Sequence, residues 1–451
     1  MSFSLSRDKG KFEWASDDLW SLFCQGSNIF KPRVYRMIWD ILRFNLFAID
    51  FLSDKGEIHS MSIGEYLDKQ GYSQAFKEDY LLPLTAGIWS IPPEKVALDF
   101  PAFALIRFFH NHQMLQLWGK PSWLTIKGGS KTYVDHIISQ IHPSRLHLKT
   151  GIQSITPIEN GVLLSTEMGK EQLFDKVIIA THTDQAVQLL GSNISPEEKT
   201  LLGGCQWSAN EAVVHYDENL MPIRKKAWTA WNYLTSTAPL SGDLETKTSA
   251  SDVNSISITF NLNILQSLPI SKHGQVFVTL NPPIPPDPKK TISKWIYHHP
   301  ELTPSLINLQ RSLGNIQGKR NIYFVGAWTG YGFHEDGWRS AMEIINRPEF
   351  HLSPNTKINM SNPMSKSEEL ESESKTKAKT IPQPKQDGLE ILYVDERNIH
   401  STILEKLLRS LVGLIDSTVK QLVVWVLWLI TLSLSCIGFI LGDDQLKKNK
   451  C

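Results

Sequence analysis

The strongest constraint on the fold lies late in the chain, where an apolar run meets a glycine-rich loop and then a helical pattern. Residues 322–325 have the pattern of a short buried strand, and residues 326–337 include four glycines. A helix is predicted to begin near Gly337 and to stop before Pro348. A strand, a glycine loop and a helix N-terminus together form a geometry that receives an anion, because backbone N–H groups and the positive end of the helix point at it.

The same loop also has a purely structural interpretation. Its glycines can serve turns alone, and His334 and Glu335 can lie in solvent while Asp336 caps the helix. A single glycine-rich loop does not decide between these two interpretations.

Composition argues against a nucleic-acid-binding surface, a zinc site and a disulfide framework. The 451 residues contain 46 lysines and arginines and 46 aspartates and glutamates, so the formal net charge is zero and the electrostatic footprint of a nucleic-acid binder is absent. The four cysteines lie far apart without CxxC spacing, which argues against a zinc site and a disulfide framework. The length predicts one large two-part domain or two domains.

Residues 1–350 mix helical and strand patterns and predict an α/β architecture with α+β elements. A helix is predicted over 131–141, directly after a glycine turn at Gly128 and Gly129. Strands are predicted at 146–150, within 161–174, and at 176–180, 275–280 and 321–325. The aromatic residues Trp228, Trp231 and Tyr233 either line a substrate region or belong to the core.

Beyond residue 350 the chain changes character. Residues 351–388 are polar, charged and proline-containing, which predicts a disordered linker. Residues 389–420 carry the stripe of an amphipathic helix, and residues 421–441 contain an uncharged run that predicts a transmembrane helix. A short polar tail, 442–451, follows. We therefore predict a single-pass membrane protein with its globular part in the cytosol; the alternative for the apolar run is a helix buried in a core.

Six ordered segments give the chain a resemblance to a known superfamily. They are the N-terminal MSFSLS, RMIWDILRFN at 36–45, WLTIKGGSKTYVDHI at 123–137, FDKVIIATHTDQAVQLL at 174–190, FVTLNPP at 277–283 and GAWTGYGFHEDGWRSAMEI at 326–344. Together they are similar to the flavin-containing amine oxidase superfamily. More narrowly, they resemble its branch of FAD/NAD(P)-binding oxidoreductases associated with cyclopropane-fatty-acyl-phospholipid synthases. The resemblance implies an FAD-binding, amine-oxidase-like two-part fold over residues 1–350.

The resemblance also implies which residues contact FAD. In the family, the backbone after the last strand meets the pyrophosphate, the final helix starts against the flavin, and other positions lie near the adenine or form a glycine turn. The corresponding residues here are Gly326, Ala327, Trp328, Asp336, Gly337, Trp338, Ile152, Ala180, Thr181, Gly128 and Gly129. Related amine oxidases usually carry an acidic residue where this chain has Trp328, so a backbone contact is expected there. No metal is implied.

One part of the family pattern is absent. The family begins with a strand, a GxGxxG turn and a helix that bind the FAD diphosphate, and this sequence contains no such pattern. Met1 corresponds to a position well inside the family's chain, so a βαβ unit of about 30 residues or more is expected to be missing, which would leave an unpaired sheet edge. Either Met1 is an internal methionine of a longer protein, or the chain is a shortened form that holds FAD poorly or not at all.

The resemblance implies an FAD-dependent oxidoreductase acting on a small molecule. The family's association with lipid-modifying enzymes, together with the predicted membrane span, suggests an apolar or lipid-derived substrate. Tyr331, His334 and Glu335 are candidates for catalysis, because their side chains could reach the flavin and His334 could transfer a proton near neutral pH. Two alternatives stay open: a non-catalytic, membrane-tethered protein and a truncated product that does not bind FAD.

Overall fold

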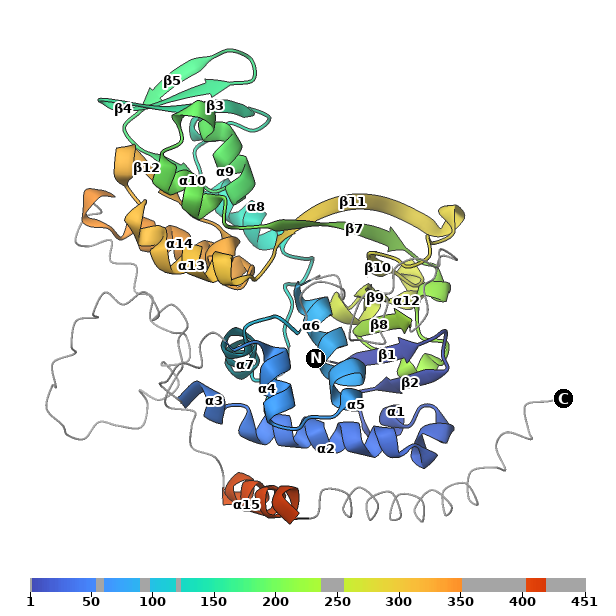
Figure 1. The fold of residues 1–451 in the computed structure, drawn as a ribbon. Coiled ribbons are helices and arrows are strands. Elements are labelled where there is room, and N and C mark those ends of the chain that lie inside the picture. Colours follow the sequence, from blue (N-terminus) through green and yellow to red (C-terminus); the bar gives the residue numbers. More distant parts are fainter. Residues whose placement is uncertain are drawn as a thin grey trace, which may run out of the picture. The chain divides into compact units, whose positions relative to one another are not determined.

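The chain divides into two units, both containing helices and strands (Figure 1). The computed structural model describes residues 2–53, 61–89, 98–118, 123–236, 255–350 and 403–418. Unit 1 consists of Met1–Leu148, Trp207–Pro304 and Val394–Cys451, and unit 2 of Lys149–Gln206 and Ser305–Tyr393. The predicted mixed α/β architecture is confirmed.

A seven-stranded sheet forms the centre of unit 1. In order along the sheet, its strands are β11 (Thr291–Pro300), β7 (Trp207–His215), β10 (Phe277–Leu280), β9 (Ser255–Asn261), β8 (Trp231–Ser236), β1 (Phe3–Arg7) and β2 (Phe12–Ala15). Neighbouring strands are antiparallel except β1 and β8, which run parallel. Tyr233 and Phe277 on the central strands are fully buried, so Tyr233 belongs to the core.

Helices and an aromatic core complete unit 1. The helices are α1 (Leu19–Leu22), α2 (Pro32–Phe47), α3 (Asp50–Ser53), α4 (Ile63–Lys69), α5 (Gln74–Phe76), α6 (Leu82–Trp89), α7 (Ala102–Asn111), α8 (Lys131–Ser139), α11 (Leu262–Leu265) and α12 (Ile270–His273). Pro32 starts α2, because the first helical position needs no N–H. Phe44 of α2 contacts the rings of Tyr72, Phe76 and Phe109, with centroids 5.9, 5.4 and 6.1 Å away. These contacts join α2, α5 and α7.

The helix α15 (Ile403–Thr418) packs on α2 and lies within the segment predicted to be amphipathic. Val412 is buried against Trp39 and Leu46, and Arg43 Nε lies 2.9 Å from the Asp416 carboxylate. Part of the apolar stripe of α15 is therefore covered by protein.

The structure corrects the localisation predicted from the sequence. Within the described ranges, no helix is long and apolar enough to cross a membrane. α15 has 16 residues where about 20 are needed, and it packs on α2. The predicted single-pass membrane location is therefore contradicted. The segment 421–441, from which it was predicted, lies outside the described residues, as do the linker 351–388 and the tail 442–451.

Unit 2 combines an antiparallel meander with a short parallel pair. β3 (Ile152–Ile158), β4 (Gly161–Thr166) and β5 (Glu171–Phe174) form the meander, and β6 (Val177–Ile179) pairs in parallel with β12 (Ile322–Phe324). The helices are α9 (Thr183–Leu190), α10 (Pro196–Leu202), α13 (Pro304–Ser312) and α14 (His334–Ile345). No third strand of the described residues joins β6 and β12, while the missing βαβ unit itself stays a prediction.

Four of the five strand predictions agree with the structure. The strand predicted at 146–150 is wrong, because Lys149 adopts a left-handed conformation with φ of 56° in a turn and the strand begins only at Ile152. The segment 161–174 contains β4 and β5, and the other three predicted segments contain β6, β10 and β12.

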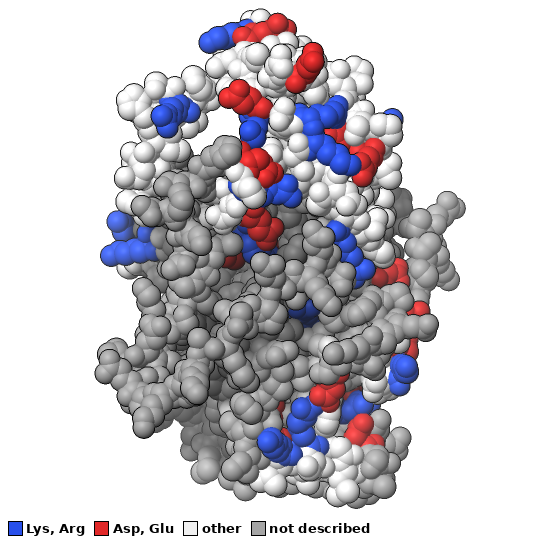
Figure 2. Space-filling view, turned by 90° about the vertical axis from the view of Figure 1, so that its left-hand side faces the viewer, with Lys and Arg blue, Asp and Glu red and all other residues white. Residues whose placement is uncertain are grey.

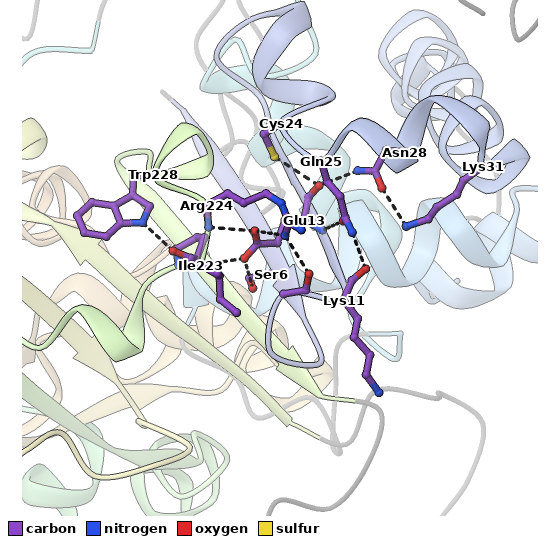
Figure 3. Close-up of polar contacts among 12 residues, drawn as sticks. Ser6, Lys11, Glu13, Cys24, Gln25, Asn28, Lys31, Ile223, Arg224 and Trp228 are labelled. Carbon is purple, nitrogen blue, oxygen red and sulfur yellow. Dashed lines mark hydrogen bonds and ion pairs between the residues drawn. The ribbon is translucent and has the colours of Figure 1, made fainter. Parts of the chain in front are cut away.

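One buried carboxylate joins three segments of unit 1 (Figure 3). Glu13 of β2 is fully buried and accepts hydrogen bonds from the Ser6 hydroxyl at 2.8 Å, the Ile223 N–H at 2.7 Å and the Arg224 N–H at 3.2 Å. The Arg224 guanidinium lies 2.8 Å from the same carboxylate and supplies the opposite charge. The contact to Ile223 spans 210 positions of sequence, so Glu13 fixes the loop 222–224 against β1 and β2.

Replacing Glu13 by Gln is expected to destabilise unit 1. The amide removes the charge that compensates Arg224 and turns an NH2 group toward donors that need an acceptor. We expect the free energy of unfolding to fall by about 2–4 kcal/mol. Urea unfolding of the full chain, followed by tryptophan fluorescence, measures the change. Glu159→Gln, at an exposed turn position, is the control, and equal losses for the two variants would contradict the role of Glu13.

His215, at the end of β7, is buried as a neutral side chain. Its Nδ1 accepts the Asp217 N–H at 3.1 Å, so Nε2 carries the proton and donates to Thr279 Oγ1 at 2.6 Å. Burial lowers the pKa of His215 below its ordinary value of 6.5, although the nearby Asp217 acts in the opposite direction. The folded state therefore disfavours protonation of this ring.

We expect His215 to make unit 1 less stable in acid. Below about pH 6.5 the unfolded chain protonates this ring more readily than the folded chain does, so stability present at higher pH is lost as the pH falls. Thermal unfolding from about pH 7.5 down to 5 should show a steeper loss for the wild type than for His215→Gln, by up to about 1.4 kcal/mol per pH unit. Identical slopes would refute this contribution.

Candidate functional site

The turn after β12 has a backbone that glycine adopts most easily. Gly326 has a φ of 151°, and a Cβ at this position would lie 2.6 Å from Nε1 of Trp328. The Val325 N–H donates to the Ile179 carbonyl at 3.0 Å, which extends the parallel pairing of β6 and β12 up to this turn. The pairing of β12 with β6 therefore fixes the position at which the short 3-10 helix η11 (Ala327–Thr329) begins.

The Trp328 side chain is buried and forms a hydrogen bond within the protein. It is 3% exposed, and Nε1 donates to the Thr181 carbonyl at 3.3 Å, just after β6. This contact brings Thr181 together with the turn at Gly326. The indole is therefore engaged within the protein, and the backbone contact with FAD expected at Trp328 stays a prediction.

Asp336 closes the loop onto α14. Its carboxylate accepts the N–H groups of Tyr331 and Phe333, both at 3.0 Å, and pairs with Arg339, also at 3.0 Å. The helix consequently begins at His334 rather than near the predicted Gly337, because this carboxylate satisfies donors ahead of the first turn. Asp336 is the third residue of α14 rather than its N-cap, which is Phe333, and its contact with FAD stays a prediction.

Two side chains that the sequence analysis did not identify hold the loop in shape. Ser340 Oγ accepts the Gly326 N–H at 3.0 Å, and Gln310 Nε2 donates to the carbonyls of Trp328 and Gly330 at 2.9 and 2.8 Å. Ser340 lies on the helix that directly follows the loop, so its contact with the loop could have been predicted from its position in the sequence. Gln310 belongs to α13, and its tertiary contact leaves no local signal in the sequence.

We call two neighbouring N–H groups of the loop open, because they have no hydrogen-bond acceptor among the described residues. Among the described residues, none accepts a hydrogen bond from the N–H of Ala327 or of Trp328. A Cβ at Gly337 would come within 3.6 Å of the Ala327 nitrogen, so glycine at this position leaves the Ala327 N–H uncovered. Adjacent N–H donors beside the N-terminal turn of a 12-residue helix suit a negatively charged group.

The three candidate catalytic residues lie around the same turn. His334 and Glu335 are exposed in the first turn of α14, and Tyr331 is half-buried in the preceding loop. Trp338, predicted to contact FAD, is 54% exposed on the same helix. Their proximity to the open N–H groups follows from the packing of α14 on η11, while their chemical roles stay predictions.

Of the remaining predicted site residues, Ala180 directly precedes Thr181 beside the turn at Gly326, and the other three lie elsewhere. Ile152 starts β3 opposite Thr166, and Ala180 is exposed directly after β6. Gly128 and Gly129, with φ of 87° and 86°, form a left-handed turn before α8 of unit 1. The turn needs glycine for its backbone, and the FAD contacts of these four residues stay predictions.

Charge on the described surface is mixed. On the face shown in Figure 2, basic and acidic side chains lie close to one another. Lys319 and Glu197 form an ion pair at 2.7 Å. Within the searched part of the chain, no group of His, Cys, Asp and Glu is arranged to hold a metal ion. The open N–H pair is therefore the feature on which we base the candidate site.

One protein family matches the sequence. Residues 55–216 match the model of a family described as flavin containing amine oxidoreductase. A search of curated proteins found no match.

Several solved structures show a distant likeness. A CLA-producing fatty acid isomerase from P. acnes is 11% identical at a TM-score of 0.48, covering 78% of this chain and 80% of that one. An oxidoreductase from Methanosarcina mazei is 13% identical at a TM-score of 0.47, with coverages of 76% and 81%. The cyclohexylamine oxidase from Brevibacterium oxydans IH-35A is 11% identical at a TM-score of 0.47, with coverages of 76% and 80%. Likeness at this level assigns neither substrate nor mechanism.

Gly337→Ala is expected to separate ligand binding from stability. The methyl group would cover the Ala327 N–H at 3.6 Å without a clash, and alanine is more favourable than glycine inside a helix by up to about 1 kcal/mol. We expect flavin affinity to fall about tenfold while the melting temperature is unchanged or higher. Flavin fluorescence titration and thermal unfolding measure the two effects. Gly314→Ala, where a Cβ meets open space, is the control; an unchanged flavin affinity in Gly337→Ala would rule out this site.

Proposed function

We propose that this chain, which belongs to the flavin-containing amine oxidase superfamily through residues 55–216, is an FAD-dependent oxidoreductase of the amine oxidase type. The observation that supports this function is the open pair of N–H groups at Ala327 and Trp328, beside the start of α14. The pair lies outside residues 55–216, so the geometry and the family match are independent arguments.

The loop fits a diphosphate in its donors and in its shape. Two adjacent N–H groups can bind oxygens of one phosphate, and the N-terminus of α14 adds its positive pole. Gly337 carries no side chain beside Ala327, so a ligand can approach the Ala327 N–H closely. The Ser340 and Gln310 contacts keep the loop in this conformation before a ligand arrives.

The negative charge of Asp336 would repel a bound phosphate only weakly. Asp336 is paired with Arg339 and has two N–H donors, so its carboxylate is compensated. Bound FAD would supply hydride acceptance from a substrate carbon. We propose Tyr331, His334 and Glu335 as the candidates for proton transfer, because all three lie around this turn. The other contacts implied by the resemblance, at Ile152, Ala180, Thr181, Gly128 and Gly129, belong to the same proposal.

The substrate that we propose is apolar or lipid-related. Its support is the resemblance to the branch of oxidoreductases associated with cyclopropane-fatty-acyl-phospholipid synthases. The main alternative is a protein that keeps the fold but binds no flavin, which the lack of a GxGxxG turn in this sequence favours.

The purified full chain is expected to bind FAD and to prefer it over FMN, which lacks the diphosphate. Protein incubated with excess cofactor is desalted, and its visible absorption spectrum gives the flavin content. In the loaded protein under anaerobic conditions, faster bleaching by dodecylamine than by ethanolamine would support the apolar substrate. Protein that is folded by circular dichroism and stays colourless would contradict the cofactor and support the non-catalytic alternative. A preparation with no protease-resistant core would favour the truncated product.

A further inference from the structure

The helix α15 carries two apolar stripes, and the one that faces α2 is covered (Figure 1). Val412, at the centre of the covered stripe, is 1% exposed. The second stripe consists of Leu407, Leu411 and Leu414, which are 63%, 53% and 70% exposed. Exposed leucines on successive turns of one helix form a continuous apolar patch, and a patch of this kind indicates an interaction surface.

The exposed stripe has the spacing of a coiled-coil seam. Leu404, Leu407, Leu411 and Leu414 recur at alternating intervals of three and four residues, which is the a and d pattern of a heptad repeat. In a coiled coil each a or d side chain enters a gap between four residues of the facing helix. The spacing therefore indicates that the occupant of this surface is another helix with the same repeat.

The flanks of the seam carry no charge. In the heptad that the leucines define, the e and g positions are Leu408, Ser410, Ile415 and Ser417. Coiled coils commonly place Glu and Lys at these positions, where the charges select the partner. Two identical seams with uncharged flanks meet without repulsion between like charges, and the same patch on two copies can be self-complementary about a twofold axis. A second copy of this chain therefore fits the seam.

Contacts within unit 1 hold α15 in place. Arg43 Nε lies 2.9 Å from the Asp416 carboxylate, and Arg409 pairs with Asp50 at 2.5 Å. The Arg409 guanidinium also lies 5.3 Å from the centroid of the Phe47 ring. A helix of 16 residues is marginally stable alone in water, so these contacts help to keep it formed. The leucines are thus presented before a partner arrives, which lowers the entropy cost of association.

We propose that Leu407, Leu411 and Leu414 pack against the same leucines of a second copy of this chain, so that two α15 helices form a short coiled coil. The seam is short, and interfaces that bury less than about 1,200 Å² form weak or transient complexes. The population of the dimer therefore depends on protein concentration. All three leucines belong to unit 1 and lie outside the flavin loop, so the proposal does not depend on the flavin function.

Sedimentation velocity of the full chain tests the dimer. We expect the wild type to pass from monomer to dimer between roughly 1 and 200 µM. Leu411→Glu is expected to weaken association about tenfold or more, because the dimer would bury a carboxylate in an apolar seam. Lys406→Glu changes the charge at an exposed position of the same helix outside the seam, and this control should keep the dimer. A monomeric wild type, or undiminished association in Leu411→Glu, would overturn the proposal.

A mixture of two double variants tests whether the seam pairs with itself. One variant combines Leu407→Glu with Leu411→Glu, and the other combines Leu407→Lys with Leu411→Lys. Each is expected to associate weakly alone, while an equimolar mixture associates more strongly, because opposite charges then meet across the seam. Association through another part of the chain would give no such gain, so an unchanged mixture would refute the self-pairing.

Two further measurements complete the test. Circular dichroism establishes that each variant is folded, which is expected because the substituted leucines are exposed. Co-sedimentation with phosphatidylglycerol vesicles examines the other apolar partner that an exposed leucine stripe can contact. A wild type that stays monomeric and binds vesicles in a manner that Leu411→Glu abolishes would replace the second copy by a lipid surface and overturn the proposal.

Discussion

The burial of Glu13 fixes much of unit 1. A carboxylate away from water must find its donors and its counter-charge inside the protein, and Glu13 takes them from β1 and from the loop 222–224. Its backbone is engaged as well, since the Glu13 N–H donates to Gln25 Oε1 at 3.0 Å and its carbonyl accepts from Asn28 Nδ2 at 2.7 Å. One residue therefore decides where the chain after β2 and the distant loop 222–224 can lie.

The glycine loop shows how far local sequence reasoning reaches. The order of strand, loop and helix followed from apolar runs and glycines, because those patterns are set by neighbours in the chain. The helix start was misplaced by three residues, since Asp336 accepts N–H groups from Tyr331 and Phe333 ahead of it. The hydrogen bonds from Gln310 to the loop could not be predicted, because they depend on how α13 packs on the loop.

The amphipathic segment shows a second limit of sequence reasoning. An apolar stripe predicts that one face of a helix is buried, but it does not identify the neighbour that buries it. In α15 part of this stripe packs on α2, where Val412 enters the core and Asp416 meets Arg43. The charged partner lies more than 350 positions earlier in the sequence, so the stripe alone could not distinguish a protein neighbour from a lipid one.

The candidate flavin loop follows one physical rule. Side chains of Ser340, Gln310 and Asp336 satisfy polar groups of the loop and leave the N–H of Ala327 without an acceptor among the described residues. A loop that is otherwise satisfied cannot easily rearrange to pair its last donor, because doing so would break bonds already made. The unpaired donor is therefore fixed in place, and a donor of this kind suits an anion.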